Sequence, residues 1–400
     1  MTRKGFHNGR LRRMREVLQG HVDRGEAPGV IALVSRRGEK HIELLGHTEP
    51  GGHAPLARDA IFRITSMTKP VTAAAAMVLV EDCKLRLDDP IDDLIPELAN
   101  RHVLTRLDAP LEDTVPAKRA ITVRDLLTFR LGFGQPFAPP DRFPVVRAAK
   151  ELGIGMGPPR PQDLGTPDAW LRKLGSLPWM HQPGEQWMYN TSADVLGILV
   201  ARASGTSFEA FLRERIFEPL GMKDTAFSVP REKRERFLNA YATNPATNAP
   251  VVLDPIDGQW SRPPAFESGG AGLVSTLDEY FAFTEMLMNL GRHRGERVLG
   301  RASVELMTTD QLTVDQKARS HWGDFFESNG WGFGMSVVTR RTGLLNEGSF
   351  GWPGGFGTSW AADPREDLVG IVLTQQAFRS PVPPPVITDF WTLAYQAIDD

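Results

Sequence analysis

Strand patterns lie at both ends of this chain of 400 residues, and a long region of mainly helical character separates them. Residues 30–35 and 40–47 are apolar-rich runs joined by a turn-forming stretch at 36–39, which predicts a β-hairpin. Strand patterns return only near the other end, at 332–340 and 368–374. Because hairpins pair antiparallel and all four runs need partners, the pattern favours one antiparallel sheet assembled from both ends of the chain.

Helical periodicity completes this plan. Leu11, Met14 and Leu18 fall on one face of an N-terminal helix, and a final helix is expected near 387–398. The sequence therefore predicts an α+β fold in which terminal helices cover the sheet and a mostly helical lobe is inserted. We expect a single domain over 1–400, with one lobe of approximately 1–65 and 267–400 and a helical lobe of approximately 66–266. The cleft between the lobes is the expected place for a site.

A Ser-x-x-Lys sequence, Ser66 to Lys69, begins the inserted region. A serine hydroxyl needs a proton acceptor within hydrogen-bond reach before it acts as a nucleophile. Residues three apart share one helix face, so Lys69 can be that partner. Pro70 is tolerated in a first turn, which places Ser66 at the start of a helix continuing over 71–80. We predict Ser66 as the nucleophile. A plain helix cap with Lys69 in solvent is the structural alternative.

Tyr189, one of only four tyrosines, lies between a Pro-Gly turn and a helix expected to start near Ala193. A phenol beside a lysine ammonium is driven toward phenolate, so Tyr189 can serve as general base for Ser66 and later for water. A glycine-rich stretch at 348–360 precedes the last strands. Glycines let backbone approach a ligand closely, and an N–H here can pair with that of Ser66 as an oxyanion hole.

Two stretches look like loops. Residues 136–167 are rich in Pro and Gly with little periodicity, and residues 231–266 are polar and rich in Asn and Pro. Long loops of this kind often shape pockets. The sole cysteine, Cys83, excludes an internal disulfide and reads as a small apolar filler.

Composition narrows the partners. A net charge of −3 with mixed signs provides no basic field for nucleic acid, so a small-molecule substrate is expected. The basic N-terminus lacks the apolar core of a secretory signal, and no run approaches the ~18 apolar residues of a membrane span. We expect a soluble cytoplasmic protein with no membrane partner and an undetermined oligomeric state. His41 and His47 share a strand face without further ligands at matching spacing, so no metal site and no cofactor are expected.

Taken together, the stretches around Ser66, Tyr189 and residues 348–360 resemble the serine β-lactamase and penicillin-binding-protein superfamily. The resemblance covers nearly the whole chain and is nearest to class C β-lactamases and family VIII carboxylesterases. It implies a β-lactamase-like fold with the active site between the two lobes. It also implies that Ser66 is the nucleophile, Lys69 its partner and Tyr189 the shared base.

The resemblance further implies substrate contacts. Trp352 matches the position at which β-lactamases carry the lysine of Lys-Thr-Gly, and family VIII esterases resemble this chain in having Trp there. Gly355, three residues on, would then supply the second oxyanion N–H, with Gly354 beside it at the substrate. Thr191 stands where class C enzymes have the Asn of Tyr-x-Asn. The absence of a cation at Trp352 argues against efficient binding of a β-lactam carboxylate.

The predicted function is a serine carboxylesterase that hydrolyses short to medium acyl esters through an acyl-enzyme on Ser66. The alternatives are β-lactamase or D-amino-acid peptidase activity, an acyltransferase of the same family, and a non-catalytic sensor of acyl ligands. An α/β-hydrolase is disfavoured because no Gly-x-Ser-x-Gly occurs. The nine histidines leave a Ser-His-Asp triad open, although none lies in a recognisable motif.

Overall fold

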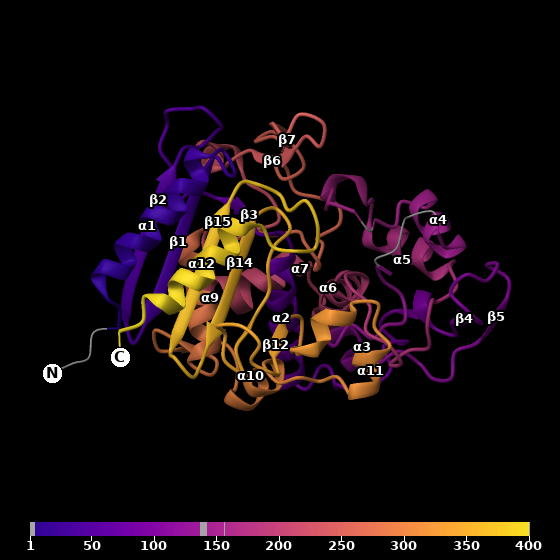
Figure 1. Ribbon diagram of the computed structural model, residues 1–400. Coiled ribbons are helices and arrows are strands. Elements are labelled where there is room, and N and C mark those ends of the chain that lie inside the picture. Colours follow the sequence, from indigo (N-terminus) through magenta and orange to yellow (C-terminus); the bar gives the residue numbers. More distant parts are fainter. Residues whose placement is uncertain (1–4, 137–141, 156, 400) are drawn as a thin grey trace.

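The structure is a computed structural model that describes residues 5–136, 142–155 and 157–399. Its centre is one antiparallel sheet in the order β11-β12-β13-β14-β15-β1-β2 (Figure 1). Strand β1 (Gly29–Arg36) pairs with β15 (Leu368–Thr374), so the two ends of the chain meet in the middle of the sheet, and every residue of both strands is buried. The predicted α+β sheet is confirmed. The other strands of this sheet are β2 (Glu39–Gly46), β11 (Asn329–Trp331), β12 (Ser336–Val338), β13 (Phe350–Gly351) and β14 (Thr358–Asp363).

Terminal helices cover one face of this sheet, as predicted. Helix α1 (Asn8–Asp23) packs on α12 (Pro385–Gln396) and on β2, and Pro385 stands at the start of α12, where a missing N–H costs little. Side chains of both helices join an outer core with residues of β1, β2 and β15. The apolar stripe read from the sequence is thus the face that α1 buries. This outer core contains Leu11, Met14, Leu18, Val30, Ala32, Val34, Val372 and Phe390.

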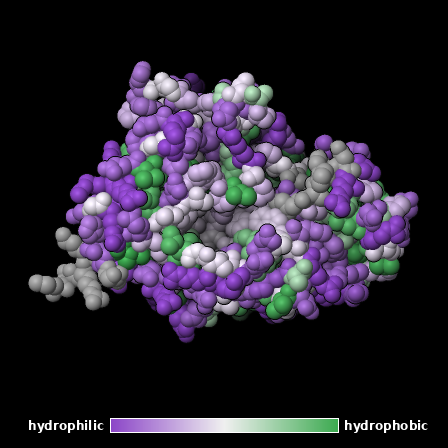
Figure 2. Space-filling view, viewed as in Figure 1, coloured by the Kyte–Doolittle hydropathy of each residue, from purple (hydrophilic) through white to green (hydrophobic). Residues whose placement is uncertain are grey.

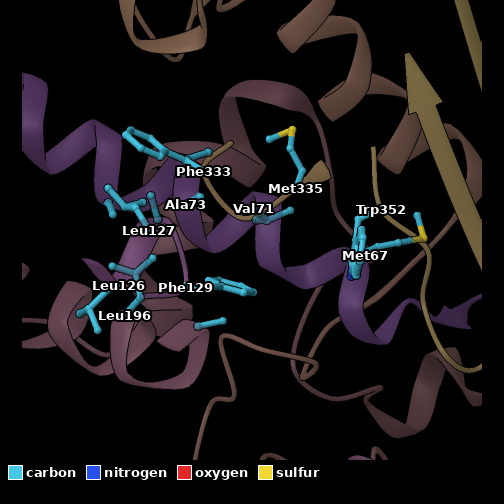
Figure 3. Close-up of a cluster of buried hydrophobic side chains, with 14 of the residues drawn as sticks. Met67, Val71, Ala73, Leu126, Leu127, Phe129, Leu196, Phe333, Met335 and Trp352 are labelled. Atoms are coloured by element: carbon cyan, nitrogen blue, oxygen red, sulfur yellow. The ribbon is translucent and has the colours of Figure 1, made fainter. Parts of the chain in front are cut away.

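Helix α2 (Thr68–Glu81) runs through the core on the other side of the sheet and packs on α6 (Thr191–Ser204). Its residues 68–79 are all buried, and a run of four alanines, 73–76, lets neighbours approach closely. Helices that are apolar all round lie inside a protein. Figure 3 shows Val71 of this helix among buried apolar side chains, with Trp352 close by. The buried cation Lys69 stands out in such a helix, because lysine is almost never fully buried unless paired.

The inserted region is mainly helical, as expected. The division of the whole chain into two lobes stays a prediction. Thr122 and Asp125 form a capping box that starts one of the short helices of the inserted region, α3 (Val123–Leu127). The remaining helices are α4 (Pro144–Glu151), α5 (Pro167–Gly175), α7 (Phe208–Leu212), α8 (Glu218–Leu220), α9 (Leu277–Met288), α10 (Arg301–Met307) and α11 (Val314–Ala318). The two-stranded pairs are β3 (Phe62–Arg63) with β8 (Val274–Ser275), β4 (His102–Leu104) with β5 (Thr114–Pro116), β6 (Ala240–Thr243) with β7 (Pro250–Asp254), and β9 (Arg292–His293) with β10 (Glu296–Arg297).

Both predicted loops contain regular structure. Within 136–167, where residues 137–141 and 156 lie outside the described part, Val145, Val146 and Ala149 bury one face of α4. The prolines that suggested a loop flank this helix, and Pro144 starts it. Within 231–266, β6 and β7 form a hairpin in which β7 is largely exposed, so no alternating apolar pattern marks it.

Between α7 and α8 the chain forms a π-helical turn, Arg213–Phe217. Two smaller predictions were wrong in detail. Of the strand expected over 332–340 only β12 forms, and β11 ends before this range, at Trp331. Cys83 is exposed at a positive φ of 57°, so it fills no core space.

Among the described residues, no single helix is long and apolar enough to cross a membrane. Only Thr191–Ser204 and Phe208–Leu220, bent by 78°, meet the length and composition criteria jointly.

Candidate active site

Ser66 lies in a 3-10 turn, Thr65–Met67, that leads directly into α2. Thr65 adopts a positive φ of 40°, which is strained for a β-branched residue. Neighbouring segments hold the turn in place: the N–H of Ile64 donates to the carbonyl of Leu273, and the hydroxyl of Tyr280 donates to the carbonyl of Met67 at 2.9 Å. Surrounding contacts therefore impose the geometry that presents Ser66. Backbone strain of this kind clusters at active sites.

Two side chains converge on the Ser66 hydroxyl. The ammonium Nζ of Lys69 lies 3.0 Å from Ser66 Oγ, and the phenol oxygen of Tyr189 also lies 3.0 Å from it. Lys69 is 1% exposed and donates a second hydrogen bond, of 2.6 Å, to the carbonyl of Gly270. Either partner, once deprotonated, is within range to accept the Ser66 proton. The structure thus brings together all three predicted catalytic residues, from η1, α2 and the segment before α6.

Tyr189 is held by aromatic neighbours as well as by Ser66. The indole N–H of Trp352 donates to its phenol oxygen at 2.8 Å, and the ring of Trp322 stacks on it with centroids 5.6 Å apart. Lys69 Nζ lies 4.6 Å from the centroid of the Tyr189 ring. An N–H donor and a nearby cation both stabilise negative charge on the phenol oxygen. The next residue, Asn190, has a positive φ of 83°, so both site segments carry a strained residue beside the reacting group.

The expected oxyanion hole has its two N–H groups unused. Within the described part of the chain, neither the backbone N–H of Ser66 nor that of Gly355 donates to a protein acceptor. Ser66 and Gly355 both line the same cavity. Unpaired backbone donors facing a cavity are available for a substrate oxygen that gains negative charge. The carbonyl of Gly355 accepts a hydrogen bond of 2.8 Å from the N–H of Phe378, which anchors this residue beside the cavity.

Of the three other residues predicted to contact substrate, only one lies at the cavity. Trp352 lines the cavity, but Gly354 and Thr191 do not. Thr191 is buried in the first turn of α6, and its neighbour Asn190 lines the cavity in its place. Gly354 packs behind the wall, where a side chain would overlap the carbonyl oxygen of Ile64. The one-residue shift from Thr191 to Asn190 follows from the γ-turn at Asn190, in which the N–H of Thr191 donates to the carbonyl of Tyr189 and which sequence spacing alone does not reveal.

Asp194 is a member of the site that sequence reasoning assigned no role. Its carboxylate accepts from the Ser268 hydroxyl at 2.6 Å and from the backbone N–H of Gly270 at 3.0 Å. Burial raises the pKa of Asp194, which the two hydrogen bonds and the charge of Lys69 partly oppose. Because the carbonyl of Gly270 binds Lys69, Asp194 holds in place the residue that positions Lys69. The available signal was an acidic residue in the first turn of an otherwise apolar helix after Tyr189.

The cavity at Ser66 has a volume of about 960 Å³. Figure 2 shows this face of the molecule hollowed near its centre, beside β14. Aromatic side chains form much of the wall, and no histidine of the described residues lines the cavity. A Ser-His-Asp triad is therefore not assembled at Ser66. The aromatic lining residues are Trp170, Tyr189, Trp322, Phe325, Phe350, Trp352, Phe356, Trp360, Phe378 and Trp391.

A serine bonded to a buried lysine and a tyrosine, facing two free N–H groups, has the parts needed for acyl transfer through a covalent intermediate. On this sheet and helical insertion, these parts define a serine hydrolase of β-lactamase-like fold. A family model described as Beta-lactamase matches residues 14–385. The chain belongs to the Beta-lactamase family.

Individual relatives agree with this membership. Protein Rv1367c of Mycobacterium tuberculosis is 39% identical over 362 residues, which cover 88% of this chain and 87% of that protein. Esterase EstB of Burkholderia gladioli is 29% identical over 88% of this chain and 86% of its own length. Among solved structures, "EstCE1, a hydrolase with promiscuous acyltransferase activity" has a TM-score of 0.78 over 96% of this chain and 98% of that chain. At 24% identity, that likeness supports the fold alone.

Proposed function

We propose that the protein is a carboxylesterase that hydrolyses esters with short to medium acyl groups through an acyl-enzyme on Ser66. The observation that carries the proposal is the double hydrogen bond at Ser66 Oγ, from Lys69 and Tyr189 at 3.0 Å each. A nucleophile in contact with two basic side chains, beside a cavity with two free N–H donors, has the minimal equipment for ester cleavage.

The reaction proceeds in two steps. Ser66 Oγ attacks the ester carbonyl carbon while the Lys69–Tyr189 pair takes its proton, and the carbonyl oxygen becomes an oxyanion facing the N–H groups of Ser66 and Gly355. Collapse of the tetrahedral intermediate breaks the bond to the alcohol oxygen, which receives the proton from Tyr189. Water then attacks the carbonyl carbon of the acyl-enzyme, and the Lys69–Tyr189 pair takes the proton of the water. That proton passes to Ser66 Oγ as the bond to the acyl group breaks and the acid leaves.

The substrate class rests on Trp352. Its apolar ring occupies the cavity wall at the point where the resemblance expects a cationic side chain in β-lactamases, and no lysine lines the cavity among the described residues. A β-lactam carboxylate would lose its charge-assisted hydrogen bond there. Neutral esters lose nothing by this change. β-Lactamase and D-amino-acid peptidase activities are therefore the weaker proposals.

Acyl transfer to an alcohol is the second candidate. The large aromatic cavity supports it, because space beside the acyl-enzyme admits an acceptor alcohol in place of water. Transfer and hydrolysis share the first step and differ only in the second nucleophile. A non-catalytic sensor is disfavoured by the intact Ser66, Lys69 and Tyr189 contacts.

The test is a rate ladder of p-nitrophenyl esters from acetate to decanoate, with a chromogenic cephalosporin alongside and Ser66→Ala as control. We expect turnover to be fastest among the shorter esters and to vanish in Ser66→Ala, which removes one hydroxyl and adds no bulk. A cephalosporin cleaved faster than every ester would replace the esterase by a β-lactamase. Mass spectrometry that finds a permanent adduct without product release would support the sensor instead.

A further inference from the structure

The cavity has a second arm that the chemistry at Ser66 does not occupy. The wall that contains Ser66 continues past Pro353 and Gly355 to residues of α12, namely Ile387, Thr388 and Trp391. Helix α12 lies on the outer face of the sheet, the face covered by the terminal helices. One continuous space therefore joins the nucleophile to the outer face of the sheet.

The terminal helices do not cover the outer face where this arm runs. The outer core contains residues from α1, α12, β1, β2 and β15, but none of the described residues of β11 to β14. Trp391 of α12 packs over Gly370 of β15, and its indole N–H reaches Ser359 of β14 at 3.3 Å. The helix thus ends its coverage at β14, and the strands beyond it border the cavity.

Small residues keep this part of the face open. Trp360 points inward to Tyr280, so Ser359 and Ala361 on either side of it point outward. Across the sheet, Ala361 pairs with Gly351. All of these outward positions line the cavity, which we call here the α12 groove: Ser359, Ala361 and Gly351 as floor, Ile387, Thr388 and Trp391 as wall.

The α12 groove offers little to a charged ligand. Ser359 already accepts the Trp391 N–H, and none of its six residues is charged. Arg379, an exposed cation at the cavity wall, is bonded to Asn248. An uncharged groove with one aromatic wall fits an extended hydrocarbon group, which gains roughly fourfold in affinity for each methylene that it buries.

The position of Tyr189 decides which half of the ester faces this arm. In the proposed reaction Tyr189 returns the proton to the leaving alcohol oxygen, so the alcohol departs on its side. Tyr189, Trp352 and Gly351 all line the cavity, so its wall runs from the phenol that protonates the leaving alcohol to the floor of the α12 groove.

We infer that the α12 groove binds the alcohol group of the substrate, and that the substrates are esters of short to medium acids with a long-chain alcohol. This inference rests on the esterase function proposed above and specifies its substrate class. Binding energy from the remote chain would then position the ester carbonyl against Ser66.

The test compares butyrate esters of ethanol, hexanol and dodecanol, each kept below its aggregation limit, in the wild type and in Ala361→Phe. The wild-type kcat/KM is expected to rise at least tenfold from ethyl to dodecyl butyrate. Ala361→Phe fills the floor, so it should abolish that rise while ethyl butyrate stays within about twofold. Ala54→Phe, the same change at an exposed position outside the cavity wall, should keep the rise.

If Ala361→Phe fails to fold, Thr388→Trp replaces it in the test. Thr388 is an exposed position of α12, and a tryptophan there narrows the α12 groove. A wild-type kcat/KM that is flat with alcohol length would overturn the inference, as would equal losses on ethyl and dodecyl butyrate in Ala361→Phe or Thr388→Trp. A chain-length gain that appears only in the p-nitrophenyl acyl series, and is lost in these variants, would assign the groove to the acyl side and also overturn it. If no ester at all were hydrolysed, the esterase function itself would fail, which is a distinct result.

Discussion

The indole N–H of Trp352 donates a 2.8 Å hydrogen bond to the phenol oxygen of Tyr189. Trp352 therefore contacts the proposed general base and also lines the cavity. The same phenol oxygen lies 3.0 Å from Ser66 Oγ, so two hydrogen bonds in series link Trp352 to the proposed nucleophile. A donor at this oxygen stabilises it when it carries negative charge.

Trp352→Phe is expected to lower kcat on a neutral ester by roughly tenfold to a hundredfold, because a hydrogen bond to a charged group contributes about 1.5–3 kcal/mol. Trp331→Phe is the matched control: Trp331 is buried in the same aromatic cluster, and its indole N–H has no partner. Equal losses of kcat in the two variants would reduce Trp352 to a packing role.

Lys69→Ala and Tyr189→Phe are each expected to reduce kcat by roughly a hundredfold to ten-thousandfold, the usual range for loss of a general base. The two groups share one proton acceptor function at Ser66 Oγ, so the double variant should lose little more than the worse single variant. Single-turnover kinetics on one activated ester, measured on all four proteins, gives this cycle. A double variant that loses the product of the two effects would mean that the residues act independently.

The sequence singled out Ser66, Lys69 and Tyr189, which the structure brings together, because each residue type is chemically restricted. The Ser-x-x-Lys spacing follows from helix geometry. Few residue types other than tyrosine can act as a general base together with a lysine. The contacts that set their geometry were not predictable from local patterns. Thr65 and Asn190 adopt positive φ because tertiary packing overrides their own preferences.

Long-range contacts account for most of what the sequence missed at the site. Trp322 stacks on Tyr189 only because a distant segment folds back over it, and Asp194 matters through the carbonyl of Gly270. The sheet was predictable because β1 and β15 carry long apolar runs and are buried on both faces. Strand β7 has only the short apolar run Val251-Val252-Leu253, which is exposed and lies in an Asn- and Pro-rich stretch.

Gly354→Ala should destabilise the protein and displace the Ser66 turn, because the added methyl would overlap the carbonyl oxygen of Ile64 and the hydroxyl of Thr358. Overpacking of this kind costs about 1–3 kcal/mol. Gly355→Ala is the neighbouring control, since no protein atom lies within 4 Å of a methyl group placed there. Thermal unfolding of both variants provides the measurement. A melting temperature unchanged in Gly354→Ala would show that the Ile64 contact yields without cost.

Acid should destabilise the fold through His181. Burial lowers the pKa of His181 to about 4, with the charge of His321 acting in the same direction and that of Glu185 opposing it. Because the folded state favours the neutral ring, the stability from His181 is complete above pH 6.5 and is lost as the pH falls from 6.5 toward 4, a change of about 3 kcal/mol. Urea unfolding between these limits should show a flatter pH dependence for His181→Asn. His53→Asn, at an exposed histidine, should keep the wild-type slope, and a parallel slope in His181→Asn would exclude this source.

Trp352→Lys addresses the substrate class. A lysine at this cavity-lining position can make a charge-assisted hydrogen bond to a ligand carboxylate, which the indole cannot. We expect the ratio of kcat/KM for a carboxylate-bearing ester to kcat/KM for its neutral analogue to rise roughly tenfold, since each 1.4 kcal/mol of differential binding changes that ratio tenfold. Absolute rates should fall, because the donor to Tyr189 is lost with the ring. Trp352→Leu separates the two effects: it removes the donor without adding charge, so its rates should fall while its ratio stays at the wild-type value. A ratio that rises equally in Trp352→Leu would mean that space at this position, and not charge, excludes carboxylates.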